Sequence, residues 1–353
     1  MNDTTQGHAS GARHPDYIRA IFDRAVVMIQ EGRLDSAEVL LQTLSAEPSA
    51  MEAASYLRGV IASSRMEKAA AQSFFRKALE ANPQNAEAHA QLGLLLLEEQ
   101  PASAAAAFAA ALALDARDPD RHVGFADALD RLGFGDLAKD SLADALARAP
   151  DHPRATALSA ALATRAPTPE AEGLSAEEES VFCDALFSEG TRRLGEGDLA
   201  RAKALYERVL KRSPNHAFTL CNLGALAREQ GDLARSEELI RRALAVDAKL
   251  VPAHLVLAET LLDSGARDAA CAQFETAIAL EPQNAAACAA YAMALQRIGA
   301  SNDAMPWFHR AIMLDQNQPA DVYAALGAAL EAMGMRDRAE IALQHAAALA
   351  KGA

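Results

Sequence analysis

The chain has 353 residues, about half of them apolar, with 5% aromatic residues and a formal net charge of −14. This negative charge argues against nucleic acid or an anionic membrane surface as a main partner, because both bind cationic surfaces. Alanine-rich runs such as "ASAAAAFAAALALDA" favour helix over strand. No run alternates Val, Ile or Thr as strands do, so the sequence predicts an all-α fold.

The N-terminal segment, residues 1–17, is polar, and we expect it to be disordered. It lacks the apolar core of a secretory signal peptide, and no stretch of ~18 uncharged apolar residues offers a membrane span. The four cysteines lie in helical patterns, without CxxC pairs or histidines at metal-ligand spacing. They are Cys183, Cys221, Cys271 and Cys288. We therefore expect free thiols, a cytoplasmic location, no cofactor and no metal site.

Residues 18–165 contain about four copies of a unit made of two apolar-periodic helices and a turn. Gly133, Ala138, Leu142 and Pro150 mark the clearest copy. The others are marked by Gly32, Ala37 and Leu41, by Gly59, Ala71, Phe75, Ala78 and Pro83, and by Leu92, Gly93, Phe108 and Ala111. In the last of these "EEQPAS" replaces the Gly turn. A further helix beginning at Pro153 is predicted to cap this array.

An acidic segment follows the first array. Residues 166–182 read "APTPEAEGLSAEEESVF", rich in Pro, Glu and Ser and without an apolar period. Such composition is typical of a linker rather than a packed element. We expect it to act as a hinge or spacer.

The clearest repeats lie in residues 183–353. "GDLAR" occurs at Gly197 and again at Gly231, and glycines in the same context recur in the next three copies at spacings of 34, 34 and 35 residues. Five residues after each Gly stands a small residue, and four further on a large one. The large residues are Tyr206, Ile240, Phe274, Phe308 and Leu343. This period predicts five repeats in phase.

Each unit is predicted to be an antiparallel helix pair. The Gly between the helices supplies the left-handed conformation that ends the first helix. Small residues such as Gly224 and Gly327 let the helices approach closely, and the large residue opposite fills the remaining gap. The Pro- or Asn-containing ends close each unit with turn chemistry.

This pattern resembles the tetratricopeptide repeat. The family signature appears as Leu223-Gly224, as Ala270 with Phe274 and Pro282, and as Leu326-Gly327 with Leu330. The aromatic residue that often opens the family's first helix is missing at Leu220, His254 and Cys288, and the fourth site holds Tyr323. The resemblance implies an α-solenoid, a right-handed superhelix of stacked antiparallel helix pairs. It also implies a concave groove, lined by first helices, that holds a peptide or helix of another protein.

The resemblance places partner-binding residues on the outward sites of the first helices. In the second array these include Asn222, Arg228, Leu255, Glu259, Met293 and Arg297, and in the first Asp120 and Asp127. The second set favours an amphipathic helix or an apolar-anchored segment, and the acidic first set favours a basic segment. Neither a carboxylate clamp of Lys, Asn and Arg nor a ladder of asparagines occurs, since only Asn222 occupies the ladder site.

Catalytic motifs such as HExxH, GxSxG, the Walker phosphate loop and GxGxxG after a strand are missing. We therefore expect no catalytic, cofactor-binding or metal-binding residues, and a non-catalytic scaffold or adaptor for protein partners. Two alternatives stay open. One is a recognition arm or subunit of a glycosyltransferase-type or other modifying enzyme, and the other is an assembly chaperone for an envelope or secreted component.

The last predicted helix, "RDRAEIALQHAAALAKGA", carries apolar residues on more than one face. Ile341, Leu343 and Leu349 would be covered by a following repeat if one existed. Repeat arrays usually end in a helix with a polar outer face. We therefore hypothesise that the C-terminal repeat mediates self-association or binds a partner.

Overall fold

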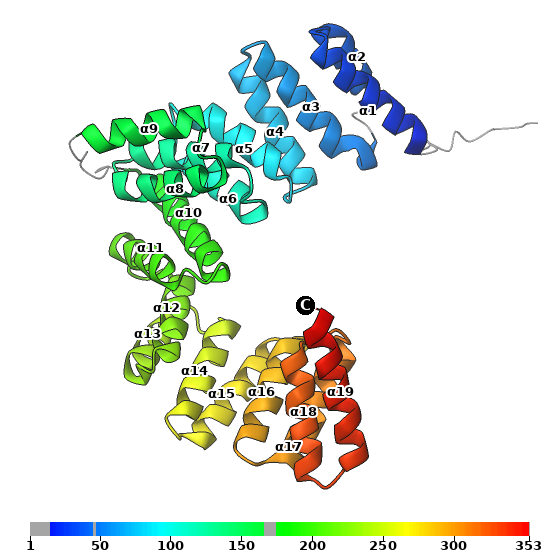
Figure 1. Cartoon of the computed structure of the whole chain (residues 1–353), viewed down its shortest axis with the longest axis vertical. Coiled ribbons are helices and arrows are strands. Elements are labelled where there is room, and N and C mark those ends of the chain that lie inside the picture. Colours follow the sequence, from blue (N-terminus) through cyan, green and yellow to red (C-terminus); the bar gives the residue numbers. More distant parts are fainter. Residues whose placement is uncertain (1–14, 45–46, 166–173, 353) are drawn as a thin grey trace, which may run out of the picture. The chain divides into compact units, whose positions relative to one another are not determined.

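The computed structural model describes residues 15–44, 47–165 and 174–352 (Figure 1). Within these ranges the chain forms α-helices joined by short turns, with a 3-10 helix at Pro48–Ala50 (η1) and no strand. The predicted all-α fold is confirmed. Contacts divide the chain into unit 1, residues 1–198, and unit 2, residues 199–353.

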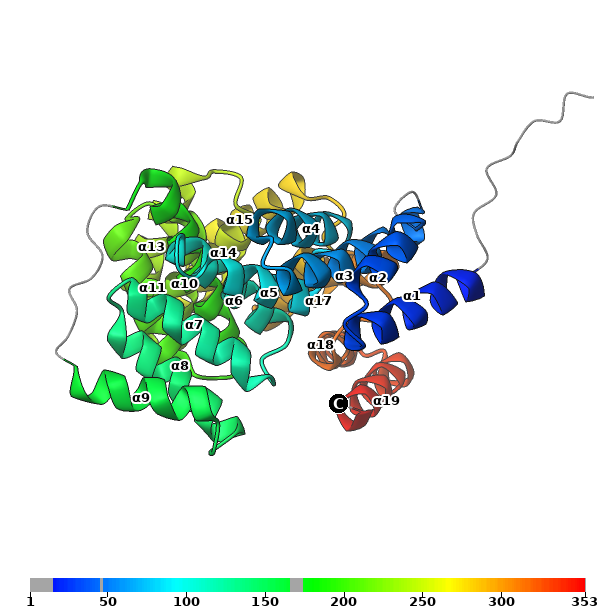
Figure 2. The same cartoon turned by 90° about the horizontal axis from the view of Figure 1, so that it is seen from above.

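Unit 1 consists of four helix pairs and two further helices. Its helices are α1 (Pro15–Gln30), α2 (Leu34–Gln42), α3 (Met51–Ser64), α4 (Lys68–Ala81), α5 (Ala86–Leu96), α6 (Pro101–Leu114), α7 (Pro119–Arg131), α8 (Gly135–Arg148), α9 (Pro153–Thr164) and α10 (Ala176–Gly195). Figure 2 shows α7, α8 and α9 side by side, and α9 contacts both of the others. Since α1 begins at Pro15, residues 15–17 of the predicted tail are helical, while residues 1–14 lie outside the described ranges.

Unit 2 continues the alternation of second and first helices. Its helices are α11 (Leu199–Arg212), α12 (Ala217–Glu229), α13 (Leu233–Val246), α14 (Val251–Asp263), α15 (Arg267–Leu280), α16 (Ala285–Arg297), α17 (Ser301–Leu314), α18 (Ala320–Ala332) and α19 (Arg336–Gly352). The first helices α12, α14, α16 and α18 contact one another in sequence. Among the described residues, no two neighbouring second helices of unit 2 contact each other as extensively as the first helices do. The first helices therefore line the inner face of the stack in unit 2.

Glycine ends the first helix of most pairs in the left-handed conformation. Positive φ occurs at Gly32, Gly133, Gly197, Gly231, Gly265, Gly299 and Gly334. At Gly231 the backbone N–H donates to the carbonyl of Arg228, and the N–H of Asp232 donates to that of Ala227, each at 2.9 Å. These bonds satisfy carbonyls that the helix end leaves open. Between α3 and α4 the left-handed residue is Met66, with φ of 61°.

The pairs interlock through the small and large residues that the period predicts. A Cβ atom added at Gly224 would lie 2.5 Å from Cδ1 of Ile240, and one at Gly327 would lie 2.7 Å from Cδ2 of Leu343. Such distances are too short for carbon atoms in van der Waals contact. The predicted facing of small and large residues is therefore confirmed at both sites.

Helix α10 belongs to unit 1 and packs there against the alanine-rich α6. Because α5 and α7 also contact α6, this helix is buried on nearly every side. Helix α10 begins inside the predicted linker. The Ser175 hydroxyl accepts from the backbone N–H of Glu178, and the Glu178 carboxylate accepts from the backbone N–H of Ser175. Residues 176–182 are thus helical rather than linker, and 166–173 lie outside the described residues. The contacts divide the chain after α10, whereas the sequence predicts the boundary at 182/183.

A buried ionic cluster joins α10 to α8. Glu189, 3% exposed, accepts from Nε of Arg192 at 2.8 Å and from Nε of Arg193 at 2.7 Å. Arg193 in turn forms an ion pair with Asp144 of α8. The rings of Phe134, which precedes α8, and Phe182 of α10 also meet, with centroids 4.8 Å apart. Paired in this way, the charges tolerate burial that would be costly for any one of them alone.

Candidate functional site

Four charged side chains form a ladder across three consecutive first helices of unit 2. Arg228 of α12 donates from Nε to Asp263 at 2.7 Å and from Nη2 to Glu259 at 3.0 Å, both on α14. Arg297 of α16 reaches the same two carboxylates, at 2.6 Å for Asp263 and 2.9 Å for Glu259. We call these four residues the charge ladder.

The charge ladder is electrically balanced and half-exposed. Its side chains are between 21% and 45% exposed. Partial burial raises the pKa of Asp263, but the hydrogen bonds from Arg228 and Arg297 outweigh it, so the pKa is lowered. Asp263 is therefore ionised at neutral pH. Each cation and each anion already has two partners of opposite charge within the chain.

Unit 1 has a cleft on its own first helices, with a volume of about 250 Å³. It is lined by Glu87, Ala90, Gln91 and Leu94 of α5, Phe108 of α6, Asp118 at the start of α7, Asp120 and Arg121 of α7, and Arg154 of α9. Phe108 is 1% exposed and forms its apolar floor. Three carboxylates surround that floor.

The acids of this cleft are partly neutralised by a buried arginine. The side chain of Arg121 is 9% exposed and forms ion pairs with Asp115 at 3.1 Å and Glu87 at 3.3 Å. Hydrogen bonds from Arg117, and then from Arg121, hold the pKa of Asp115 well below its ordinary value. Asp120, 65% exposed, points its carboxylate to Nε2 of His152 at 3.2 Å.

Two family profiles match the sequence. The profile described as "Tetratricopeptide repeat" matches residues 53–85, which span α3 and α4. The profile described as "Cilia and flagella-associated protein 70 middle TPR-like domain" matches residues 173–304, from α10 to α17. Both matches cover paired helices of the kind described above. The chain contains tetratricopeptide repeats.

Solved structures of similar helical repeats were also found. "Crystal structure of MamA" is 24% identical, with a TM-score of 0.38, and the match covers 46% of this repeat protein and 95% of that chain. "MamA MSR-1 C2" is 21% identical, with a TM-score of 0.38, covering 48% of this chain and 97% of that one. A comparison with curated protein sequences gave no significant match.

Among the predicted groove residues of this repeat protein, the structure brings Arg228, Glu259 and Arg297 together in the charge ladder. Leu255 and Met293 are half-buried on α14 and α16. Asn222 is held differently, since its Nδ2 donates to the hydroxyl of Tyr206 on α11 at 3.0 Å.

In the repeats of unit 1, the two predicted acids take different positions. Asp120 lines the cleft described above, whereas Asp127 accepts from Nε of Arg131, one turn later on the same helix, at 3.0 Å. Asp120 and Asp127 therefore do not act on one pocket. That either contacts a partner stays a prediction.

Sequence reasoning missed Asp263, the fourth member of the charge ladder. The signal was present: Asp263 stands two residues before a turn glycine, and so does Arg297, 34 residues later. Equivalent sites in adjacent repeats are neighbours on the first-helix face. Opposite charges at such sites indicate an ion pair between repeats.

Other features give no chemical site within the described residues. No group of three His, Cys, Asp or Glu side chains there could hold a metal ion. In that same part of the chain, no helix combines the length and apolarity that crossing a membrane requires. Burial raises the pKa of Cys221 to about 11, which leaves it a protonated and unreactive thiol. On α19, the apolar side chains of Ile341 and Leu343 are 67% and 37% exposed. That the C-terminal repeat mediates association stays a prediction.

Proposed function

We propose that this protein is a non-catalytic scaffold that holds a segment of a partner protein on the first-helix face of unit 2. The charge ladder supports this proposal. Its two cations and two anions satisfy one another, so a partner on this face gains more from apolar contacts than from the ladder's charges. Tetratricopeptide repeats bind proteins with this face, and the partner's class is inferred from the side chains beside the ladder.

Apolar side chains share the ladder's face. Leu255 lies four residues before Glu259 on α14, and Met293 lies four residues before Arg297 on α16. Residues four apart on a helix are neighbours on one side of it. Both apolar side chains are half-buried. Methionine adapts its shape to irregular apolar surfaces, so we infer an apolar-anchored helix or extended segment as the occupant.

A strongly charged segment fits this surface less well. Its charges would have to displace arginines or carboxylates from pairs at 2.6–3.0 Å. Exchange of one exposed ion pair for another yields little free energy. The charge ladder thus ties three repeats together and gives a charged segment little advantage.

The unit 1 cleft is proposed as a second contact point, for a single basic side chain. Phe108 would contact the aliphatic stem, while Asp120 and Glu87 would face the charged end. Asp120→Lys should then weaken binding of a partner that occupies this cleft. Glu80→Lys, an exposed carboxylate on α4 outside the cleft lining, is the matched control.

The proposal is tested with full-length protein as bait. A partner that co-purifies at fixed stoichiometry is identified, and its Kd is measured for Leu255→Asp and Met293→Asp. We expect at least a tenfold loss, about 1.4 kcal/mol. Thr276→Asp introduces the same charge on exposed α15 and should leave Kd within about twofold.

Equal effects of the groove and control variants would contradict the proposal. The nature of the partner separates the two alternatives. A transferase or other modifying enzyme as the stable partner favours a recognition arm, and many unfolded clients favour a chaperone.

A further inference from the structure

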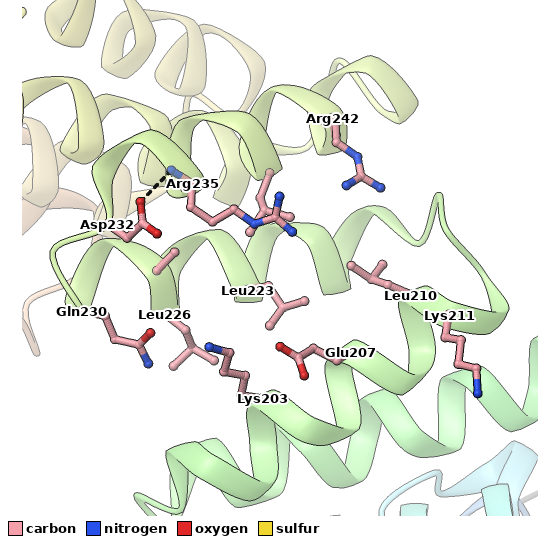
Figure 3. Close-up of a pocket in the computed structure, with 12 residues that line it drawn as sticks. Lys203, Glu207, Leu210, Lys211, Leu223, Leu226, Gln230, Asp232, Arg235 and Arg242 are labelled. Atoms are coloured by element: carbon pink, nitrogen blue, oxygen red, sulfur yellow. Dashed lines mark hydrogen bonds between the residues drawn. The ribbon is translucent and has the colours of Figure 1, made fainter.

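A second surface lies on the other side of unit 2, in a cleft of about 400 Å³ between the second helices α11 and α13 (Figure 3). Its lining residues are Lys203, Glu207, Leu210 and Lys211 of α11, Leu223, Leu226, Ala227 and Gln230 of α12 and its C-terminus, and Asp232, Arg235, Leu239 and Arg242 of α13 and its N-cap. The cleft opens because α11 and α13 each pack on α12 and make no comparably extensive contact with one another. Its volume lies within the ~300–1,000 Å³ typical of ligand sites.

The floor of the cleft is apolar and rigid. Leu223 is 7% exposed, and Leu226 and Leu239 are each 3% exposed. All three are held by the packing of α12 and α13. A preformed apolar floor favours burial of apolar side chains from a partner, since the cleft needs no rearrangement to receive them.

The rim of the cleft carries four cations, Lys203, Lys211, Arg235 and Arg242, and two anions, Glu207 and Asp232, so its net charge is positive. Figure 3 shows the side chains of Lys203, Arg235 and Arg242 directed toward the space between the two second helices, with Lys211 at one end. Arg235 pairs with Glu238 at 2.7 Å, but both side chains are about half-exposed. Such surface pairs contribute little and exchange readily. The whole chain has a net charge of −14, so this gathering of cations departs from its average surface.

The repeat pattern does not require these cations. One period of 34 residues later, the positions of Lys203, Lys211, Arg235 and Arg242 are occupied by Glu237, Ala245, Ala269 and Thr276. No cation occupies any of these four positions in the next repeat. The helix pair folds equally well with either set, because all these sites lie away from the interlocking small and large residues. The next cleft thus lacks the cations of this one, although Arg201 and Arg208 precede Arg235 and Arg242 by one period.

The spacing of the cations fits an extended ligand. Arg235 and Arg242 are seven residues apart on α13, and Lys203 and Lys211 are eight apart on α11. At 1.5 Å per residue these separations are about 10–12 Å, two helical turns. A small anion cannot contact both ends at once. A helix laid along the cleft presents carboxylates at positions i and i+7, with apolar residues between them at i+3 and i+4.

We propose that the cleft between α11 and α13 docks an acidic amphipathic helix of a partner protein. Leucine-sized side chains of that helix enter between Leu223 and Leu239, and its flanking carboxylates meet Lys203, Arg235 and Arg242. This surface is independent of the first-helix face. The scaffold then holds two partners at once, one on each face of unit 2.

The test is a selection from a phage-displayed library of 16-residue helical peptides on the full-length protein. A parallel selection uses the double variant Lys203→Glu, Arg242→Glu, whose changed side chains are exposed. The wild-type protein should enrich peptides with Asp or Glu at i and i+7 and Leu, Ile or Met between them. The double variant should not enrich them.

An enriched peptide is then measured by fluorescence anisotropy. The double variant should weaken its Kd at least tenfold, and raising salt from 0.05 to 0.5 M should weaken it further, since exposed charges are screened. Arg241→Glu makes the same charge change as Arg242→Glu alone, on α13 but outside the cleft lining, and should change Kd less than twofold. Circular dichroism confirms the helix content of each variant.

Three results would overturn the proposal. One is enrichment of peptides without the acidic spacing. Another is an equal loss for Arg241→Glu and the double variant. The third is tight binding of dodecanoate to the cleft with no peptide enriched, which would identify a site for small anionic amphiphiles. Leu255→Asp should leave peptide binding unchanged, so failure here is distinct from failure of the proposed first-helix site.

Discussion

Helices α6 of unit 1 and α13 of unit 2 occupy equivalent places as second helices of their repeats, yet their environments are opposite. α6, "PASAAAAFAAALAL", has no charged residue and is covered by α5, α7 and α10. α13, "LARSEELIRRALAV", buries only the side that meets α12 and its neighbours, and its arginines face outward. The repeat dictates one buried face of a second helix. The composition of the other face decides whether another element covers it.

The ion networks of the two units differ in the same way. In unit 1 the cluster of Glu189 with Arg192 and Arg193 is almost wholly buried. In unit 2 the charge ladder is between 21% and 45% exposed. Buried networks are costly to break because the remaining charge has no solvent, while exposed ones contribute modestly. Substitutions in the two networks should therefore differ in their effect on stability.

The largest effect is expected for Glu189→Ala. This change leaves Arg192 and Arg193 buried with fewer counter-charges, and breaking such a network typically costs about 3–5 kcal/mol. Urea unfolding monitored by circular dichroism should show an early transition of unit 1. Glu196→Ala removes a 42% exposed partner of Arg192 and should cost less than about 1 kcal/mol. Similar losses for both variants would contradict a buried cluster.

Glycine substitutions compare how the two units pack. A Cβ at Gly124 would overlap the ring of Phe108, which lies on α6 between Gly93 of α5 and Gly124 of α7, whereas a Cβ at Gly224 meets the movable end of Ile240. Gly124→Ala should cost about 2 kcal/mol and Gly224→Ala about 1 kcal/mol. Gly195→Ala, which meets no atom within 4 Å, should be neutral. Thermal unfolding gives the order, and a reversed order would show that α6 can yield.

A pH effect near neutrality is expected in unit 1. His122 is fully buried, and burial lowers its pKa despite a hydrogen bond with the Ala116 carbonyl and the nearby Asp144. Below its unfolded pKa of about 6.5, the unfolded state binds a proton that the folded state refuses. Stability should therefore fall as pH drops from about 6.5, with a slope of up to ~1.4 kcal/mol per pH unit. His122→Gln should remove this slope, and its persistence would assign it to another group.

The smallest effect is expected in the charge ladder. Arg297→Gln removes one exposed member, and exposed pairs contribute about 0.2–1 kcal/mol. In 1 M salt, where the Debye length is ~3 Å, the difference from wild type should shrink further. The effect of Glu189→Ala should hardly change in the same salt, because buried pairs are screened less. Denaturant unfolding at two salt concentrations checks both statements.

The start of α10, which the sequence prediction missed, does have a local signal. Ser175 and Glu178 form a capping box, and this spacing of Ser and Glu predicts a helix start within the segment interpreted as linker. The acidic composition around it outweighed that signal. By contrast, nothing local indicates that α10 packs on α6, because the two helices are distant in sequence and each has an apolar face that several partners could satisfy.

The sequence by itself determined the helix pairs, their turns and the interlocking of Gly224 with Ile240, because these depend on residues within one 34-residue period. The first-helix positions of Arg228, Glu259 and Arg297 also followed from that period. Only the tertiary structure decided that Asp263 completes the charge ladder, that α10 covers α6, and that a cationic cleft opens between α11 and α13. These features depend on how far apart neighbouring helices stand, and a repeat period specifies which helices are neighbours but not the space between them.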